Sequence, residues 1–194
     1  MSKLSKILAL TAVVVAATAA IAVAATINGT PGPDNLIGTA SGDSINGFAG
    51  NDWMIGQGAG DNMSGGDNDD KMYGDGKCPP GSGGPSVCDT GDGSKDSGDN
   101  MDGENGNDYV NGNGGGDNVS GGAGNDTVIG GAGGDNIFGN DGSDKIYAQD
   151  GTKDNIDCGA GADTAYVDKT KDNWKNCETV VFTTTAAPAA VKAK

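Results

Sequence analysis

Aspartates recur every nine residues along most of the chain, and each is followed two positions later by an apolar residue. Asp126 precedes Val128, for example, and Asp135 precedes Ile137. Carboxylates and main-chain carbonyls are hard oxygen donors, and calcium binds roughly six to eight of them at once. Because glycines surround these aspartates and let carbonyls turn toward an ion, the spacing predicts a series of calcium sites.

Thirteen aspartates occupy the same position of this nine-residue unit, and all of them are candidate metal ligands. They are Asp34, Asp43, Asp52, Asp61, Asp70, Asp99, Asp108, Asp117, Asp126, Asp135, Asp144, Asp154 and Asp163. One extra residue near Asp150 shifts the phase without ending the pattern. Acidic, glycine-rich composition is also typical of disordered chains, but a random sequence would not hold one register over this length.

The period also defines the elements that must position these carboxylates. The residues around each apolar position form a short strand with that side chain inward, and the other six residues form a glycine-rich turn. Two units complete one coil, so equivalent residues recur every eighteen positions. Asp99, Asp117 and Asp135 then form one column. The sequence predicts an all-β fold, a parallel β-roll or β-solenoid.

Stacked carboxylates repel one another, by about 3 kcal/mol at most for each neighbouring pair. One buried apolar side chain per unit contributes only about 1.5–3 kcal/mol, less than the conformational entropy lost on ordering nine residues. The roll is therefore expected to be unstable without a cation and to fold as calcium binds.

The units Gly121–Ile129 and Gly130–Phe138 match the nonapeptide G-G-x-G-x-D-x-U-x. Over about residues 27 to 168 the chain resembles the RTX, or hemolysin-type, calcium-binding repeat family. The resemblance implies ions between turns of adjacent coils, held by position-six aspartates and turn carbonyls. The expected pairs are Asp99/Asp117, Asp117/Asp135, Asp108/Asp126, Asp126/Asp144, Asp34/Asp52, Asp52/Asp70 and Asp43/Asp61.

Five segments are predicted. Residues 1–24 are a signal peptide cleaved near Ala24/Ala25, 25–73 the N-terminal repeats, 74–93 a disulfide-pinned insertion loop, 94–168 the C-terminal repeats, and 169–194 a cap and disordered tail. Exported chains favour disulfides, and local pairing joins Cys78 to Cys88 and Cys158 to Cys177. Whether the two repeat segments form one continuous roll stays open.

Composition limits the function. The chain has no histidine and a formal net charge of −15, so His-based catalysis is excluded and binding to nucleic acid or anionic membranes is disfavoured. We expect no enzyme, but a secreted, extracellular protein that binds several Ca²⁺. The alternative is an adhesion or surface-matrix scaffold.

Two outward rows of residues add further expectations. Asn100, Asn118, Asn136 and Asn155 fall on one face at coil spacing and are expected to form an amide ladder. The opposite face carries Tyr109, Thr127, Lys145 and Thr164. Such arrays leave ice binding as a lesser option.

Overall fold

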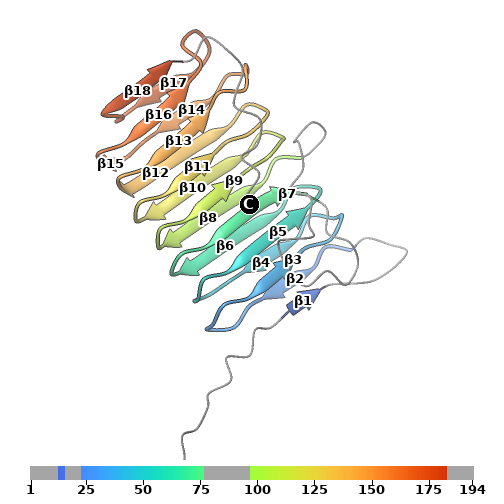
Figure 1. The fold of residues 1–194 in the computed structure, drawn as a ribbon. Coiled ribbons are helices and arrows are strands. Elements are labelled where there is room, and N and C mark those ends of the chain that lie inside the picture. Colours follow the sequence, from blue (N-terminus) through green and yellow to red (C-terminus); the bar gives the residue numbers. More distant parts are fainter. Residues whose placement is uncertain (1–12, 16–22, 77–96, 183–194) are drawn as a thin grey trace, which may run out of the picture.

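The protein is a stack of short parallel strands that form two facing sheets (Figure 1). The computed structural model describes residues 13–15, 23–76 and 97–182. These residues contain strands and turns but no helix, and hence no helix that could span a membrane. The predicted all-β parallel β-roll is therefore confirmed.

Strands alternate between the two sheets along the chain. Sheet A contains β1 (Val13–Val15), β3 (Asn35–Ile37), β5 (Trp53–Gln57), β7 (Lys71–Asp75), β9 (Tyr109–Asn111), β11 (Thr127–Ile129), β13 (Lys145–Ala148), β16 (Thr164–Val167) and β18 (Thr179–Phe182). Sheet B contains β2 (Thr26–Asn28), β4 (Ser44–Asn46), β6 (Asn62–Asp67), β8 (Asn100–Asn105), β10 (Asn118–Ala123), β12 (Asn136–Gly142), β14 (Asn155–Asp157) and β17 (Asn173–Lys175), and β15 (Ala160–Gly161) pairs with β12.

The core is two facing columns of apolar side chains, one from each sheet. In β9, β11 and β13 the central residues Val110, Val128 and Ile146 are fully buried, whereas their strand neighbours point outward. This is the alternation expected of a strand whose successive side chains face opposite sides. Each unit therefore contributes one principal side chain to a continuous, thin core.

The two repeat segments form one continuous roll. Met63 of β6 pairs with Met101 of β8, and Met72 of β7 pairs with Val110 of β9. The register step here is 38 residues, against 18 between most neighbouring coils. The twenty residues in excess lie between β7 and β8 in the sequence, and residues 77–96 are outside the described part of the chain. Because Gly74 and Asp75 belong to β7, the regular roll extends slightly past the predicted boundary at residue 73.

The roll also continues beyond residue 168, into the predicted cap. Strands β17 and β18 pair in register with β14 and β16. The Cys158–Cys177 disulfide ties this last coil to the preceding one, with a Cα–Cα distance of 5.1 Å, as predicted. Trp174 and Phe182 pack edge to face, their ring centroids 5.4 Å apart. The tail, residues 183–194, lies outside the described part of the chain.

The N-terminal end carries one strand inside the predicted signal peptide. Val13–Val15, which form β1, pair with β3. The rest of that segment up to residue 22 is outside the described residues, so its cleavage stays a prediction.

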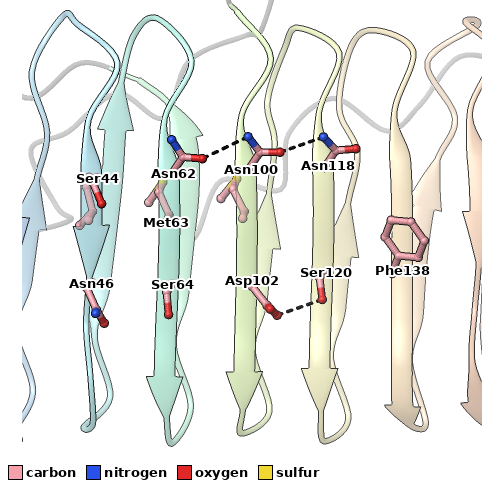
Figure 2. Close-up of a pocket in the computed structure, with 12 residues that line it drawn as sticks. Ser44, Asn46, Asn62, Met63, Ser64, Asn100, Asp102, Asn118, Ser120 and Phe138 are labelled. Atoms are coloured by element: carbon pink, nitrogen blue, oxygen red, sulfur yellow. Dashed lines mark hydrogen bonds between the residues drawn. The ribbon is translucent and has the colours of Figure 1, made fainter. Parts of the chain in front are cut away.

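An amide ladder runs along the outer face of sheet B (Figure 2). Each asparagine after the first donates its Nδ2–H to the Oδ1 of its neighbour in the preceding coil, over 2.8–3.2 Å. The ladder contains Asn62, Asn100, Asn118, Asn136, Asn155 and Asn173. The predicted ladder is thus confirmed and is longer than the sequence indicated. On sheet A, Tyr109, Thr127, Lys145 and Thr164 are neighbours, as expected.

Candidate metal sites

The thirteen predicted aspartates are all buried, and they form two columns at opposite edges of the roll. The first column precedes the strands of sheet A and contains Asp34, Asp52, Asp70, Asp108, Asp126, Asp144 and Asp163. The second column precedes the strands of sheet B and contains Asp43, Asp61, Asp99, Asp117, Asp135 and Asp154. Every neighbouring pair expected from the sequence is adjacent in these columns.

A repeated hydrogen bond connects each aspartate to the next coil. The backbone N–H of Asp108 donates to Oδ1 of Asp126 over 2.8 Å, and the N–H of Asp126 donates to Oδ1 of Asp144 over 2.9 Å. The same bond joins Asp135 to Asp154 in the second column. From the second coil onward, one carboxylate oxygen of each column aspartate is thereby fixed by the fold.

The second carboxylate oxygen has no such partner in the middle of the roll. Oδ2 is buried and accepts no hydrogen bond in Asp52, Asp61, Asp70, Asp108, Asp126, Asp135, Asp144, Asp154 and Asp163. Burying a charged oxygen without a partner is costly, so native structures normally pair such groups. A row of these oxygens indicates a cation as the missing partner.

Main-chain carbonyls supply further oxygens beside each carboxylate. A Cβ placed on Gly56 would overlap both Oδ2 of Asp61 and the carbonyl oxygen of Gly74 in the next coil. Gly103 has the same surroundings, formed by Asp108 and Gly121. The first position of the unit therefore requires glycine, because two oxygens from adjacent coils converge there. Hard oxygen donors of this kind fit calcium.

The turn backbone is held in a conformation that favours glycine. In the turn before Asp126, Gly122 and Gly124 have φ values of 107° and 145°. Phe48 and Glu104 occupy the position equivalent to Gly122 in two other turns, and their φ values are 74° and 71°. Non-glycine residues adopt such angles at a cost, so this turn conformation is imposed by the roll.

Burial raises the pKa of the central carboxyl groups. The pKa of Asp61 rises to about 7, chiefly because the group is desolvated, and the neighbouring carboxylates Asp99 and Asp43 add to the rise. The pKa of Asp154 rises to about 8 for the same leading reason. Each of these carboxylates also accepts a hydrogen bond from the backbone N–H of the aspartate in the preceding coil, Asp43 for Asp61 and Asp135 for Asp154. This bond lowers the pKa and so opposes the effect of burial. The site therefore disfavours ionised carboxylates unless a cation is present.

The first two turns differ from the central ones. The N–H of Thr30 donates to Oδ2 of Asp34, and the N–H of Thr39 donates to Oδ2 of Asp43, both over 2.5 Å. The Thr30 hydroxyl also donates to Asp34, over 3.0 Å. These carboxylates, although predicted as ligands, are engaged within their own turns.

Two acidic residues extend the columns beyond those predicted from the sequence. Asp172 continues the second column, and its Oδ1 accepts the N–H of Asp154 over 3.1 Å. Glu178 ends the first column, where its Oε2 accepts the N–H of Asp163 over 2.9 Å. Asp172 could have been found, since it lies nine residues after Asp163 and two before Trp174. Glu178 breaks the nine-residue spacing and could not.

In the described part of the chain, the acidic side chains meet as pairs of neighbours within a column and do not form clusters of three or more. Among the described residues, no three His, Cys, Asp or Glu side chains gather where they could hold a metal ion. An ion between coils would depend on turn carbonyls for its remaining ligands. The predicted Cys78–Cys88 disulfide lies outside the described residues.

Comparison with known protein families matches the RTX calcium-binding nonapeptide repeat in four copies, over residues 28–63, 95–128 and 129–165. These ranges cover more than half of the chain and coincide with coils of the roll. The chain belongs to the RTX calcium-binding nonapeptide repeat family. The matched ranges contain both columns of this RTX roll between Asp34 and Asp163, apart from Asp70. No curated protein and no solved structure matches the chain.

Proposed function

We propose that this RTX protein is a secreted calcium-binding protein whose roll folds as several Ca²⁺ ions bind between stacked turns. The buried, unpartnered Oδ2 atoms of the central aspartates carry this proposal. The ligands are the position-six aspartates with the turn carbonyls of the adjacent coil. The thirteen predicted aspartates remain the proposed set, and Asp34 and Asp43 are its weakest members because their turns already engage them.

The electrostatics support folding coupled to binding. The chain carries a formal net charge of −15, and its acidic columns stack carboxylates in successive coils. Bound calcium would supply the positive charge that these columns lack. Since the unfolded chain does not hold the aspartates and carbonyls together, the free energy of ion binding stabilises the folded roll.

Two features support export from the cell. The N-terminal residues combine Lys3 and Lys6 with an apolar run and a small-residue cleavage pattern at Ala22–Ala24. The Cys158–Cys177 disulfide is a bond that persists in oxidising compartments. The proposal therefore places the working protein outside the cell, where calcium is available to it as a ligand.

Isothermal titration of the full chain with calcium, disulfide intact, tests the proposal. We expect uptake of several calcium ions, no comparable heat with magnesium, and reduced uptake by the double variant Asp70→Asn/Asp108→Asn. Asp102→Asn is the matched control, because Asp102 is an exposed acidic residue of β8 outside the columns. No calcium uptake by the parent chain, or equal uptake by the double variant, would contradict the proposal.

A further inference from the structure

The two edges of the roll differ in the residue that directly precedes each column aspartate. On the edge of the first column, which we name the Asn edge, consecutive turns place Asp69, Asn107, Asn125 and Ser143 there. On the edge of the second column, which we name the Gly edge, the corresponding residues are Gly60, Gly98, Gly116, Gly134 and Lys153. The repeat therefore has two kinds of turn, which alternate along the chain.

Side chains bind successive turns of the Asn edge to one another. The N–H of Asn107 donates to Oδ1 of Asp69 over 2.8 Å, and the N–H of Asn125 donates to Oδ1 of Asn107 over 2.9 Å. The N–H of Ser143 continues the series to Oδ1 of Asn125, over 2.9 Å. This second ladder joins four turns through residues adjacent to the column aspartates. Glycine cannot form it.

Main-chain pairing also runs around the turns of the Asn edge. The N–H of Gly106 donates to the carbonyl of Ala123 over 2.9 Å, and the N–H of Gly124 donates to that of Asp141 over 2.8 Å. The pairing reaches Gly161 in the following coil. These turns are thus held in place by contacts that need no ion.

The Gly edge has less of this support and contains both interruptions of the repeat. Main-chain pairing there joins Gly115 to Ala132, Ala132 to Asn113 and Gly76 to Gln57. In the next coil the N–H of Gly133 instead donates to Oδ2 of Asp150, where the extra residue shifts the phase. The connection from β7 to β8, in which Asp99 follows Asp70 by 29 residues instead of nine, also belongs to this edge. Glycines lose more conformational entropy on ordering than other residues, so forming these turns requires more free energy from the ion.

Both edges nevertheless carry the same ligand chemistry. Oδ2 of Asp108, Asp126 and Asp144 is buried without a partner on the Asn edge, as is Oδ2 of Asp61, Asp135 and Asp154 on the Gly edge. The edges thus differ in how firmly the turn is held before an ion arrives, while both present buried aspartate carboxylates to it, seven on the Asn edge and six on the Gly edge. Preorganised ligands bind more tightly than ligands that must be ordered.

We propose that the roll binds calcium in two classes, with the Asn edge filling at lower calcium concentration and the Gly edge at higher concentration. This inference rests on the proposed calcium-dependent function and assigns each class to named turns. Ions on the Asn edge would join the two repeat segments first, because the pair Asp70/Asp108 crosses the insertion. Filling of the Gly edge would then complete the coils.

Two single variants assign the classes in a calcium titration of the full chain with its disulfide intact. Asp126→Asn removes a ligand from the Asn edge, and Asp135→Asn removes one from the Gly edge. The parent should show two binding phases. Asp126→Asn should diminish the low-concentration phase and Asp135→Asn the high-concentration phase. A single phase in the parent, or loss from the same phase in both variants, would overturn the inference.

A pair of double variants exchanges the turn residues and leaves every aspartate in place. Asn107→Gly/Asn125→Gly should raise the calcium midpoint of the first phase about tenfold, through added entropy and lost hydrogen bonds. Gly116→Asn/Gly134→Asn should lower the midpoint of the second phase. A Cβ on Gly116 would lie 3.4 Å from the Gly134 carbonyl oxygen, and a Cβ on Gly134 would lie 3.3 Å from that of Lys153, so the turns must shift by a few tenths of an ångström to accept the side chains.

The outcomes separate this inference from the proposed function. Calcium uptake by the parent with midpoints unchanged in both double variants would overturn the two classes and leave calcium-dependent folding intact. Absence of calcium uptake by the parent would overturn the proposed function itself. If the Asn107→Gly/Asn125→Gly variant does not fold, the lower calcium midpoint expected of Gly116→Asn/Gly134→Asn still tests whether there are two classes.

Discussion

The backbone N–H of Asp108 donates to Oδ1 of Asp126, eighteen residues later, while Oδ2 of Asp126 is buried with no hydrogen-bond partner. The Asp126 side chain thus links two coils through Oδ1, and its Oδ2 faces the turn. This relationship repeats along both columns. If the proposed function is right, the same residue should stabilise the roll when calcium is present and destabilise it when calcium is absent.

Asp126→Asn should therefore act in opposite directions in the two conditions. In chelator the substitution removes a buried charge and keeps an oxygen for the Asp108 N–H, so we expect stabilisation by about 1 kcal/mol. At saturating calcium it removes a ligand and should destabilise the roll. The β content by circular dichroism in chelator, and urea unfolding in calcium, measure the two effects. A change of the same sign in both conditions would count against this role.

The pH dependence should reverse with calcium in the same way. Without calcium, burial raises the pKa of Asp70 and Asp108 to about 7 and that of Asp154 to about 8 in the folded chain. Between about pH 8 and pH 4 the folded state then binds more protons than the unfolded state, so its stability rises as the pH falls. With calcium bound the carboxylates are held ionised, so protons compete and acid should release the ion.

Far-UV circular dichroism between pH 8 and pH 5 follows both cases. In chelator the β signal should increase on acidification, and at a limiting calcium concentration it should decrease. A β signal in chelator that is lost on acidification would show that the ionised carboxylates are not the groups that destabilise the calcium-free roll.

The threonine turns at the N-terminal end should depend less on calcium than the central turns. Oδ2 of Asp43 already accepts the Thr39 N–H, whereas Oδ2 of Asp126 has no such donor. We expect Asp43→Asn to shift the calcium midpoint by less than about twofold and Asp126→Asn to shift it by about tenfold or more. Equal shifts would show that Asp43 binds calcium as the central residues do.

The amide ladder should stabilise the roll independently of calcium. Asn118 donates to Asn100 over 2.8 Å and accepts from Asn136 over 2.9 Å (Figure 2). Asn118→Ala removes both bonds on an exposed face and should lower the free energy of unfolding by about 1–2 kcal/mol. Urea unfolding at saturating calcium measures this. Ser44→Ala, at the same strand position but outside the ladder, should change it by less than about 0.5 kcal/mol.

The Cys158–Cys177 disulfide should hold the last coil in place. Its nineteen-residue separation predicts a loss of about 3 kcal/mol when both cysteines become serine. Limited proteolysis at saturating calcium should then cut the double variant first near β17 and β18. Unchanged protection of these strands would mean that Trp174 and Phe182 alone suffice.

Much of this fold could be predicted because a nine-residue period determines the strand face, the core and the aspartate phase together. Val128 and Asp126 followed directly from that phase, and so did the ladder through Asn118. The junction could not be predicted, because the spacing from Asp70 to Asp99 does not show how the residues divide between roll and insertion. The pairings Asp61/Asp99 and Asp70/Asp108 appear only in the register of β6 to β9.

The engagement of Asp43 was also beyond the sequence pattern. Counting positions treats every position-six aspartate alike, whereas the Thr39 turn provides its own N–H to the carboxylate. The difference depends on backbone angles: the turns that require positive φ begin at Phe48, after the two threonine turns. Local turn geometry therefore decides which carboxylates are left for an ion.

Circular dichroism of the full chain, disulfide intact, tests the central claim most directly. The chain is first placed in chelator near pH 7.5 and then titrated with calcium to about 10 mM, with magnesium as the control; that range covers the weakest class of extracellular calcium sites. We predict a coil-like spectrum that turns cooperatively to β with calcium and stays unchanged with magnesium. A full β spectrum in chelator, unaltered by calcium, would contradict the claim that the roll folds as its ions bind.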